Sequence, residues 1–208
     1  KEGKKVILIE ACGRDSASYC DQAVYIRPGT DGALALAMMH VLWREHLEDE
    51  DFLRNQSEGY EQFLPEIKKS TPQWAQEITG IPAAMIEELA AAYGRAKAPA
   101  IVLGSGLSRY GNGGMTVRLI TILSAFTGAW KHPGGGICGC DHNLGDFVDT
   151  KRITRPDFRK SPARIVNINQ LSSALNAEGK EKIRALYVYA GNPVNSVCDQ
   201  TGILKGIE

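Results

Sequence analysis

The sequence predicts an α/β fold, a three-layer domain in which helices cover both faces of a mostly parallel sheet. Two observations carry this prediction. Short apolar runs rich in β-branched residues recur along the chain, and runs with helical spacing of apolar residues separate them. Strands that alternate with helices form α/β units with parallel strands. The 208 residues, 43% hydrophobic and 23% charged, suffice for one such domain with its own core.

Four strands and six helical segments are expected. The strands are the apolar runs at 5–11 (KVILIEA), 23–26 (AVYI), 100–106 (AIVLGSG) and 185–193 (ALYVYAGNP). The helices are expected from Asp31 onward, through Phe52 and Leu53, and within 70–80, 81–99, 114–128 and 163–179. Pro72 in a first turn, and Gly80 and Gly128 as stops, mark three of their ends.

Residues 1–208 are expected to form a single α/β domain. Residues 134–164, rich in Gly, Pro and charge, show little periodicity and predict a long irregular excursion within it. Because the chain opens on KEGKKVILIE, directly into a strand, we expect it to be a fragment of a longer protein.

The composition excludes several function classes. Lys plus Arg equals Asp plus Glu at 24 each, which argues against nucleic acid or anionic lipid as a partner. No apolar run is long enough for a membrane span. Five cysteines at irregular spacing are too few for a disulfide scaffold, so free thiols are expected.

Polar and glycine-rich clusters follow all four predicted strands: EACGRD, RPGTD, GSGLSRYGNGG and AGNPVNS. In an open parallel sheet the carboxyl ends of the strands share one edge, where ligands bind. One ligand could therefore touch all four clusters.

The first two clusters each have a functional and a plain interpretation. Glu10 can accept hydrogen bonds from a ribose or a base edge, or it is a solvated carboxylate at a strand end. Gly29 permits close approach of a ligand, Thr30 can cap the next helix, and Asp31 can accept from ligand N–H groups. The same Pro-Gly-Thr-Asp sequence is also ordinary turn and cap chemistry.

The remaining motifs exclude more than they establish. The segment GSGLSRYGNGG lacks the Gly-Lys-Ser/Thr ending of a P-loop, and no GxGxxG follows the first strand, so an ordinary ATP or NAD site is not expected. Cys138, Cys140 and His142 offer metal-binding groups, but no second ligand pair accompanies them, and we predict no metal site. No histidine has the partners of a triad hydrolase.

Taken in order, the motifs resemble the molybdopterin oxidoreductases of the dimethyl sulfoxide (DMSO) reductase family. The resemblance lies in IRPGTDGALALAMMHVL, WAQEITGIPAAMIEELAAAYGRAKAPAIVLGSGLSRYGNGG, TVRLITILSAFTGAWKHPGGGI and ALYVYAGNPVNSVCD, and covers nearly the whole chain. It implies a Rossmann-like domain that binds molybdopterin guanine dinucleotide (bis-MGD in the family) with Mo or W. The metal ligand and an iron–sulfur cluster are expected in a missing N-terminal part, so the catalytic residues stay unknown.

The resemblance also implies which residues bind the cofactor. Glu10 and the following residues match the strand end that meets the nucleotide, and Asp31 matches the residue that recognises guanine. The full set of implied cofactor-binding residues is Glu10, Cys12, Arg14, Gly29, Thr30, Asp31, Ser105, Gly106, Arg109 and Asn192.

Two departures from the family pattern affect this assignment. Family members often carry Asp-Pro-Arg where this chain has Glu10, Ala11 and Cys12, and Arg14 is close enough to replace the missing arginine. Formate dehydrogenases have Arg-Gly-Gln-Asn-Asn where this chain has CGCDHNLGD, which favours a reductase of S-oxides or sulfur compounds such as DMSO, thiosulfate or polysulfide. A formate dehydrogenase or nitrate reductase of the same family is the alternative.

The resemblance implies that the full-length protein is an enzyme of anaerobic respiration. The isolated fragment is expected to be inactive, with the remaining domains of the same chain and electron-transfer subunits as partners. The full enzyme would lie on the cytoplasmic or periplasmic side of a bacterial membrane complex. The alternative of another class is an α/β ligand-binding or interaction domain without a redox role.

Overall fold

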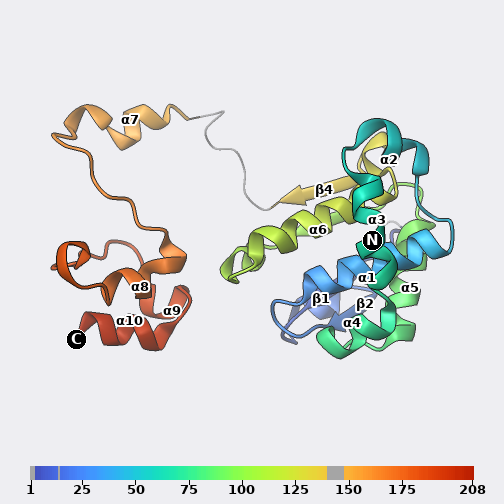
Figure 1. Ribbon diagram of the computed structural model, residues 1–208, viewed down its shortest axis with the longest axis horizontal. Coiled ribbons are helices and arrows are strands. Elements are labelled where there is room, and N and C mark those ends of the chain that lie inside the picture. Colours follow the sequence, from blue (N-terminus) through green and yellow to red (C-terminus); the bar gives the residue numbers. More distant parts are fainter. Residues whose placement is uncertain (1–2, 14, 140–147) are drawn as a thin grey trace. The chain divides into compact units, whose positions relative to one another are not determined.

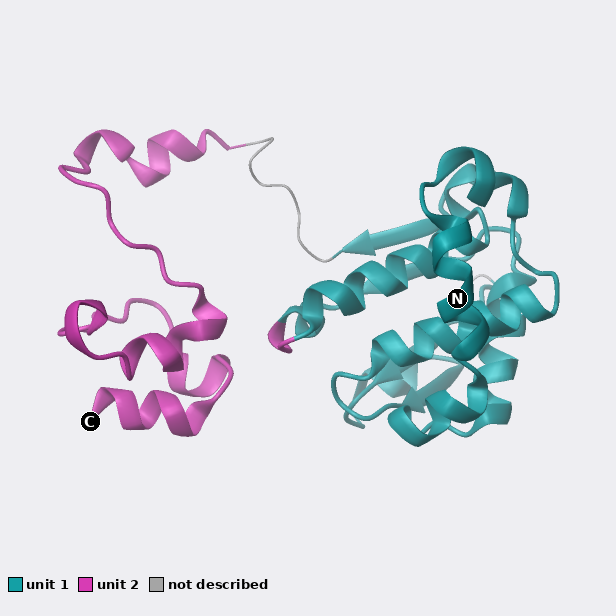
Figure 2. Ribbon diagram, viewed as in Figure 1, with its two compact units in different colours: residues 1–108, 112–140 teal, residues 109–111, 141–208 magenta. Residues whose placement is uncertain are grey.

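The computed structural model describes residues 3–13, 15–139 and 148–208. The chain divides into two compact units (Figure 2), residues 1–108 with 112–140, and residues 109–111 with 141–208. That residues 1–208 form a single domain stays a prediction.

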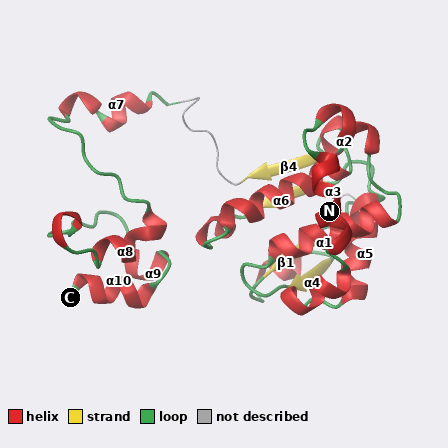
Figure 3. Ribbon diagram, in the orientation of Figure 1, coloured by secondary structure: helices red, strands yellow, loops and turns green. Residues whose placement is uncertain are grey.

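Unit 1 alternates strands and helices, as predicted (Figures 1 and 3). Its strands are β1 (Ile7–Glu10), β2 (Gln22–Tyr25), β3 (Ala100–Leu103) and β4 (Gly136–Gly139). Its α-helices are α1 (Asp31–Arg44), α2 (Glu50–Gln56), α3 (Tyr60–Lys69), α4 (Pro72–Thr79), α5 (Ala83–Gly94) and α6 (Gly113–Phe126). Short 3-10 helices cover Asp15–Tyr19 (η1), Ser105–Arg109 (η2) and Ala129–Lys131 (η3).

The strands form two parallel pairs. Glu10 lies opposite Tyr25 in the β1–β2 pair, and Leu103 lies opposite Gly139 in the β3–β4 pair. The predicted α/β class and its parallel pairing are confirmed. The strand β4 falls inside the stretch 134–164 that the sequence marked as irregular, so that stretch begins with a strand of the fold.

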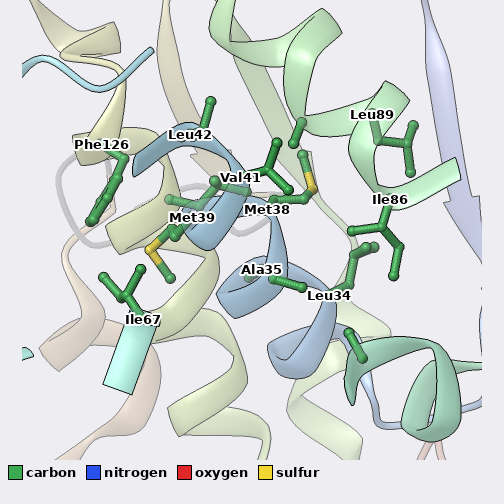
Figure 4. Close-up of a cluster of buried hydrophobic side chains, with 14 of the residues drawn as sticks. Leu34, Ala35, Met38, Met39, Val41, Leu42, Ile67, Ile86, Leu89 and Phe126 are labelled. Carbon is green, nitrogen blue, oxygen red and sulfur yellow. The ribbon is translucent and has the colours of Figure 1, made fainter. Parts of the chain in front are cut away.

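Helix α1 forms the centre of the core. It contacts α3, α4, α5 and α6, and more than half of its residues are buried. Figure 4 shows its side chains Leu34, Met38 and Met39 among residues of the surrounding helices. His40 is 8% exposed, and its Nδ1 lies 3.0 Å from the carbonyl oxygen of Ile67. Helix α1 is thus packed on several sides.

Unit 2 is built from short helices. They are α7 (Thr150–Thr154), α8 (Leu171–Leu175), α9 (Pro193–Ser196) and α10 (Gln200–Ile207), with 3-10 turns at Pro156–Phe158, Ile168–Gln170 and Gly179–Glu181. The Oγ of Ser172 donates to the Asp199 carboxylate at 2.5 Å, and the Asn176 amide donates to the Gly202 carbonyl at 2.7 Å, which ties α8 to α10.

The predicted fourth strand at 185–193 is wrong. Residues 182–189 carry no assigned secondary structure, and the side chains of Tyr187 and Tyr189 are 89% and 84% exposed. A strand requires hydrogen bonds to a neighbouring strand. Among the described residues of unit 2 there is no strand to supply these hydrogen bonds. The β-like sequence of residues 185–193 is therefore not sufficient to form a strand.

No helix in the described stretches is long and apolar enough to cross a bilayer.

Candidate functional site

The carboxyl ends of β1 and β2 meet at one edge, as the sequence predicted for neighbouring parallel strands. The Ile26 N–H donates to the Glu10 carbonyl at 3.0 Å, which continues the ladder one residue beyond the strands. Glu10 therefore lies next to the start of the turn that leads from β2 into α1. This contact brings the first two predicted clusters together.

The turn at Arg27–Thr30 explains the residues that crowd into it. The Thr30 N–H donates to the Arg27 carbonyl at 3.3 Å, which closes a four-residue turn. Gly29, the third residue, has φ +79, a left-handed conformation that a side chain disfavours. Pro28 precedes it at the position where prolines favour such turns.

Thr30 does not cap α1 through its side chain. Its backbone is at the N-cap position, but its hydroxyl donates to the Arg27 carbonyl at 2.7 Å and makes no hydrogen bond to the helix amides. The hydroxyl thus reinforces the turn. Thr30 is thus the N-cap residue of α1, as predicted, but its hydroxyl accepts no hydrogen bond from the helix amides.

Asp31 and Glu10 place two carboxylates at this edge, and both residues are half-buried. Burial raises the pKa of the Asp31 carboxyl above its ordinary value, its own backbone N–H lowers the pKa in part, and the charge of Glu10 raises it further. One oxygen of Glu10 accepts from the Ala11 N–H at 2.9 Å. Two such carboxylates form an acceptor-rich site that suits a ligand with N–H or O–H donors.

Cys12 follows directly after this edge and is exposed. Arg14, the predicted replacement for a missing arginine, lies outside the described residues.

The glycine-rich segment after β3 forms η2, where Ser105 and Gly106 are exposed. The helix that follows, α6, lies close to the start of α1, because a Cβ on Gly32 would sit 3.1 Å from Cδ1 of Leu119. Glycine is required at position 113 by packing and not by a ligand, since a Cβ there would lie 2.3 Å from the Leu107 carbonyl oxygen. The third cluster therefore leads into a helix that touches the helix of the second.

Arg109 and Asn192 belong to unit 2. Arg109 ends η2 and is exposed. Asn192 is the N-cap of α9, where its Oδ1 accepts from the Asn195 N–H at 3.2 Å. The structure thus gives Asn192 a local role that sequence reasoning missed, although Asn followed by Pro is a known sign of a helix start.

Within the described residues there is no group of three or more His, Cys, Asp or Glu side chains that could hold a metal. Cys138 is exposed and its thiol is free, whereas Cys140 and His142 lie outside the described part of the chain. The other described cysteines, Cys12, Cys20 and Cys198, are also free thiols.

Comparison with known proteins adds independent evidence. The probable oxidoreductase YoaE of Bacillus subtilis is 37% identical over 209 residues, which cover 100% of this chain and 30% of that protein. Formate dehydrogenase H of Escherichia coli is 26% identical over 230 residues, covering 100% of this chain and 32% of that enzyme. The dimethyl sulfoxide/trimethylamine N-oxide reductase of Rhodobacter capsulatus is 33% identical over 142 residues, covering 65% of this chain and 17% of that enzyme.

The fold has a counterpart among solved structures. Acetylene hydratase from Pelobacter acetylenicus matches 99% of this chain and 33% of its own, with a TM-score of 0.71 and 22% identity. The chain thus spans about a third or less of the length of these proteins. The model of the family described as molybdopterin oxidoreductase matches residues 1–206, and the chain belongs to that family.

Proposed function

We propose that this chain is a molybdopterin guanine dinucleotide-binding domain of a molybdenum or tungsten oxidoreductase. The observation that carries the proposal is the pair of half-buried carboxylates, Glu10 and Asp31, at the shared edge of β1 and β2. Between them the backbone turns at Gly29, without a Cβ that would keep a ligand at a distance.

A guanine base fits this arrangement. Its N1–H and exocyclic amino group are adjacent donors, and an ionised carboxylate accepts two such hydrogen bonds. Asp31 would accept from the base, and Glu10 would accept from a second donor such as a ribose hydroxyl. The other contacts proposed from the family resemblance are Cys12, Arg14, Thr30, Ser105, Gly106, Arg109 and Asn192.

The residues of this chain bind and orient the cofactor. When bound, the cofactor's metal supplies the two-electron chemistry, which in this family includes oxygen-atom transfer. No residue of the chain is assigned a catalytic role, and the chain by itself is expected to be inactive. The complete protein is proposed to carry the metal ligand and an iron–sulfur cluster in other segments, and to pass electrons to partner subunits.

For the substrate we propose an S-oxide or a sulfur compound. The support is the CGCDHNLGD segment, which departs from the Arg-Gly-Gln-Asn-Asn of formate dehydrogenases, and the relative that is a dimethyl sulfoxide/trimethylamine N-oxide reductase. The alternative is a formate dehydrogenase, favoured by the similarity to formate dehydrogenase H over the whole chain.

The test is the nucleotide content of the complete protein. Asp31→Asn keeps the shape of the side chain but replaces one acceptor oxygen with a donor. A hydrogen bond to a charged group changes the binding constant at least roughly tenfold. We therefore expect the amount of GMP released by acid hydrolysis, per polypeptide, to fall by at least roughly that factor. The control is Glu88→Gln, an equal charge change on the exposed side of α5. Full nucleotide content in Asp31→Asn would contradict the proposal.

A further inference from the structure

Helix α4 has no positive charge of its own at its carboxyl end. Its last turn carries no basic residue, and the helix stops at Gly80, which has φ +78. The last four carbonyls of any α-helix lack partners within the helix. In α4 these belong to residues 76–79, and only the first of them is met by the chain that follows, through the Gly80 N–H at 2.9 Å.

Arg27 supplies the partners for the other three. Its backbone N–H donates to the Thr79 carbonyl at 2.9 Å. Its Nη1 donates to the carbonyl of Glu77 and, at 3.2 Å, to that of Ile78. The guanidinium thus lies at the negative end of the helix dipole, where a cation is favoured. A residue about 50 positions away in the sequence completes the end of this helix.

The same residue holds the turn before Asp31. The Arg27 carbonyl accepts both the backbone N–H and the hydroxyl of Thr30. Gly80 allows the approach from the other side, since a Cβ there would lie 3.4 Å from Nε of Arg27. Arg27 thus links the end of α4 to Asp31 through two sets of hydrogen bonds. Its donors bind the carbonyls of α4, and its carbonyl binds Thr30, the residue before Asp31.

We propose that Arg27 is a positioning residue that fixes Asp31 for recognition of a guanine nucleotide through the end of α4. This inference rests on the proposed function. Arg27 does not itself touch the base. Its effect on the ligand passes through the turn and is therefore absent when Asp31 can no longer discriminate between bases.

The experiment compares the binding of GDP and of inosine diphosphate (IDP), which lacks the exocyclic amino group of guanine, to the cofactor-free complete protein. Isothermal titration gives the ratio of the two dissociation constants. We expect the unmodified protein to favour GDP roughly tenfold, and Arg27→Gln to favour it about threefold or less. Arg27→Lys, which keeps the charge but not the fork of donors, should lie between them. The double variant with Asp31→Asn should match Asp31→Asn alone.

Two matched pairs separate positioning from general destabilisation. Arg44→Gln removes an arginine whose partners are the side chains of Glu45 and Glu87 on the surface, and it should leave the GDP/IDP ratio unchanged. Gly80→Ala and Gly59→Ala impose the same left-handed strain, at φ +78 and φ +82, but only Gly80 touches Arg27. Only Gly80→Ala should lower the ratio.

The outcomes distinguish the two proposals. If Asp31→Asn leaves the ratio unchanged, the proposed guanine site is wrong and this inference falls with it. If Asp31→Asn abolishes the preference while Arg27→Gln retains it, the guanine site stands and Arg27 serves only the stability of α4.

Discussion

Asp49 is the N-cap of α2 and also forms an ion pair. Replacing it should change the free energy of unfolding in a way that distinguishes the contribution of the cap from that of the ion pair. One oxygen of Asp49 accepts from the Phe52 N–H at 3.0 Å, and the other pairs with the ammonium of Lys131. Loss of an N-cap acceptor costs about 1 kcal/mol. Because the Lys131 side chain is 41% exposed, its ion pair is worth roughly 0.2–1 kcal/mol.

Asp49→Ala should therefore lower the free energy of unfolding of unit 1 by about 1–2 kcal/mol. Asp49→Asn, which retains the cap, should lower it by no more than about 1 kcal/mol. Urea unfolding followed by tryptophan fluorescence measures this directly, because the chain's three tryptophans, Trp43, Trp74 and Trp130, all lie in unit 1.

The pH dependence gives a second check. The hydrogen bond from Lys131 lowers the pKa of Asp49, burial opposes this, and the Phe52 N–H lowers it further. A lowered pKa in the folded state means that the stabilisation is complete above the unfolded pKa, and is lost as the pH falls through the folded one. The difference between Asp49 and Asp49→Asn should thus shrink in acid. Equal costs for the Ala and Asn variants at neutral pH would refute the assignment of the cap.

Three further predictions follow from buried or strained positions and from the candidate site. Phe126→Ala, at a side chain that is 1% exposed, should cost about 3–5 kcal/mol in the same urea assay. Gly136→Ala should also destabilise unit 1, since the residue has φ +102 and a Cβ there would lie 2.6 Å from the ring of Trp130; an unchanged urea midpoint would contradict this. GDP binding should weaken as the pH falls through the raised pKa of Asp31, because only the ionised carboxylate accepts both donors of guanine; Asp31→Asn should remove this contribution in titrations at several pH values.

The sequence predicted the elements whose patterns are local. The spacing of Leu34, Met38 and Val41 identifies α1 because it is the apolar face that the structure buries. Thr71, Pro72 and Gly80 bound α4 where the structure has it, with the Thr71 hydroxyl accepting from the Trp74 N–H at 3.2 Å. Such signals act between residues a few positions apart, so they do not depend on contacts with distant parts of the chain.

The elements that were missed depend on distant residues. The strand β4, Gly136–Gly139, contains only Ile137 and Cys138 between two glycines, and pairing with β3 is what makes it a strand. Residues 185–193 have the opposite character, a strong β-like sequence without a partner in its unit. Helix α3 carries Pro65 and several charges, and the burial of Tyr60 and Ile67 holds it in place.

The residues of the candidate site could be predicted from the sequence, but the hydrogen bonds that hold them in position could not. Neighbouring parallel strands must end at one edge, so Glu10 and Asp31 could be expected to lie close together. The Thr30 hydroxyl donates to the Arg27 carbonyl and does not accept from the helix amides, and this is decided by the exact geometry of the turn, which no residue pattern specifies. The contacts of Arg27 with α4 could not be foreseen, because the only sequence signal is the lack of a basic residue at the end of that helix.

The distance along the chain between Arg27 and the end of α4 has a consequence during synthesis. Ribosomes add about 5–20 residues per second, so the 50 residues from Arg27 to Glu77 take roughly 3–10 s to appear. Over that interval α4 does not yet exist to hold the turn through Arg27. The position of Asp31, which follows the turn, is not fixed either. The proposed guanine site would therefore be fixed only after α4 has left the ribosome, and cofactor loading at that site is expected later than the synthesis of this part of the protein.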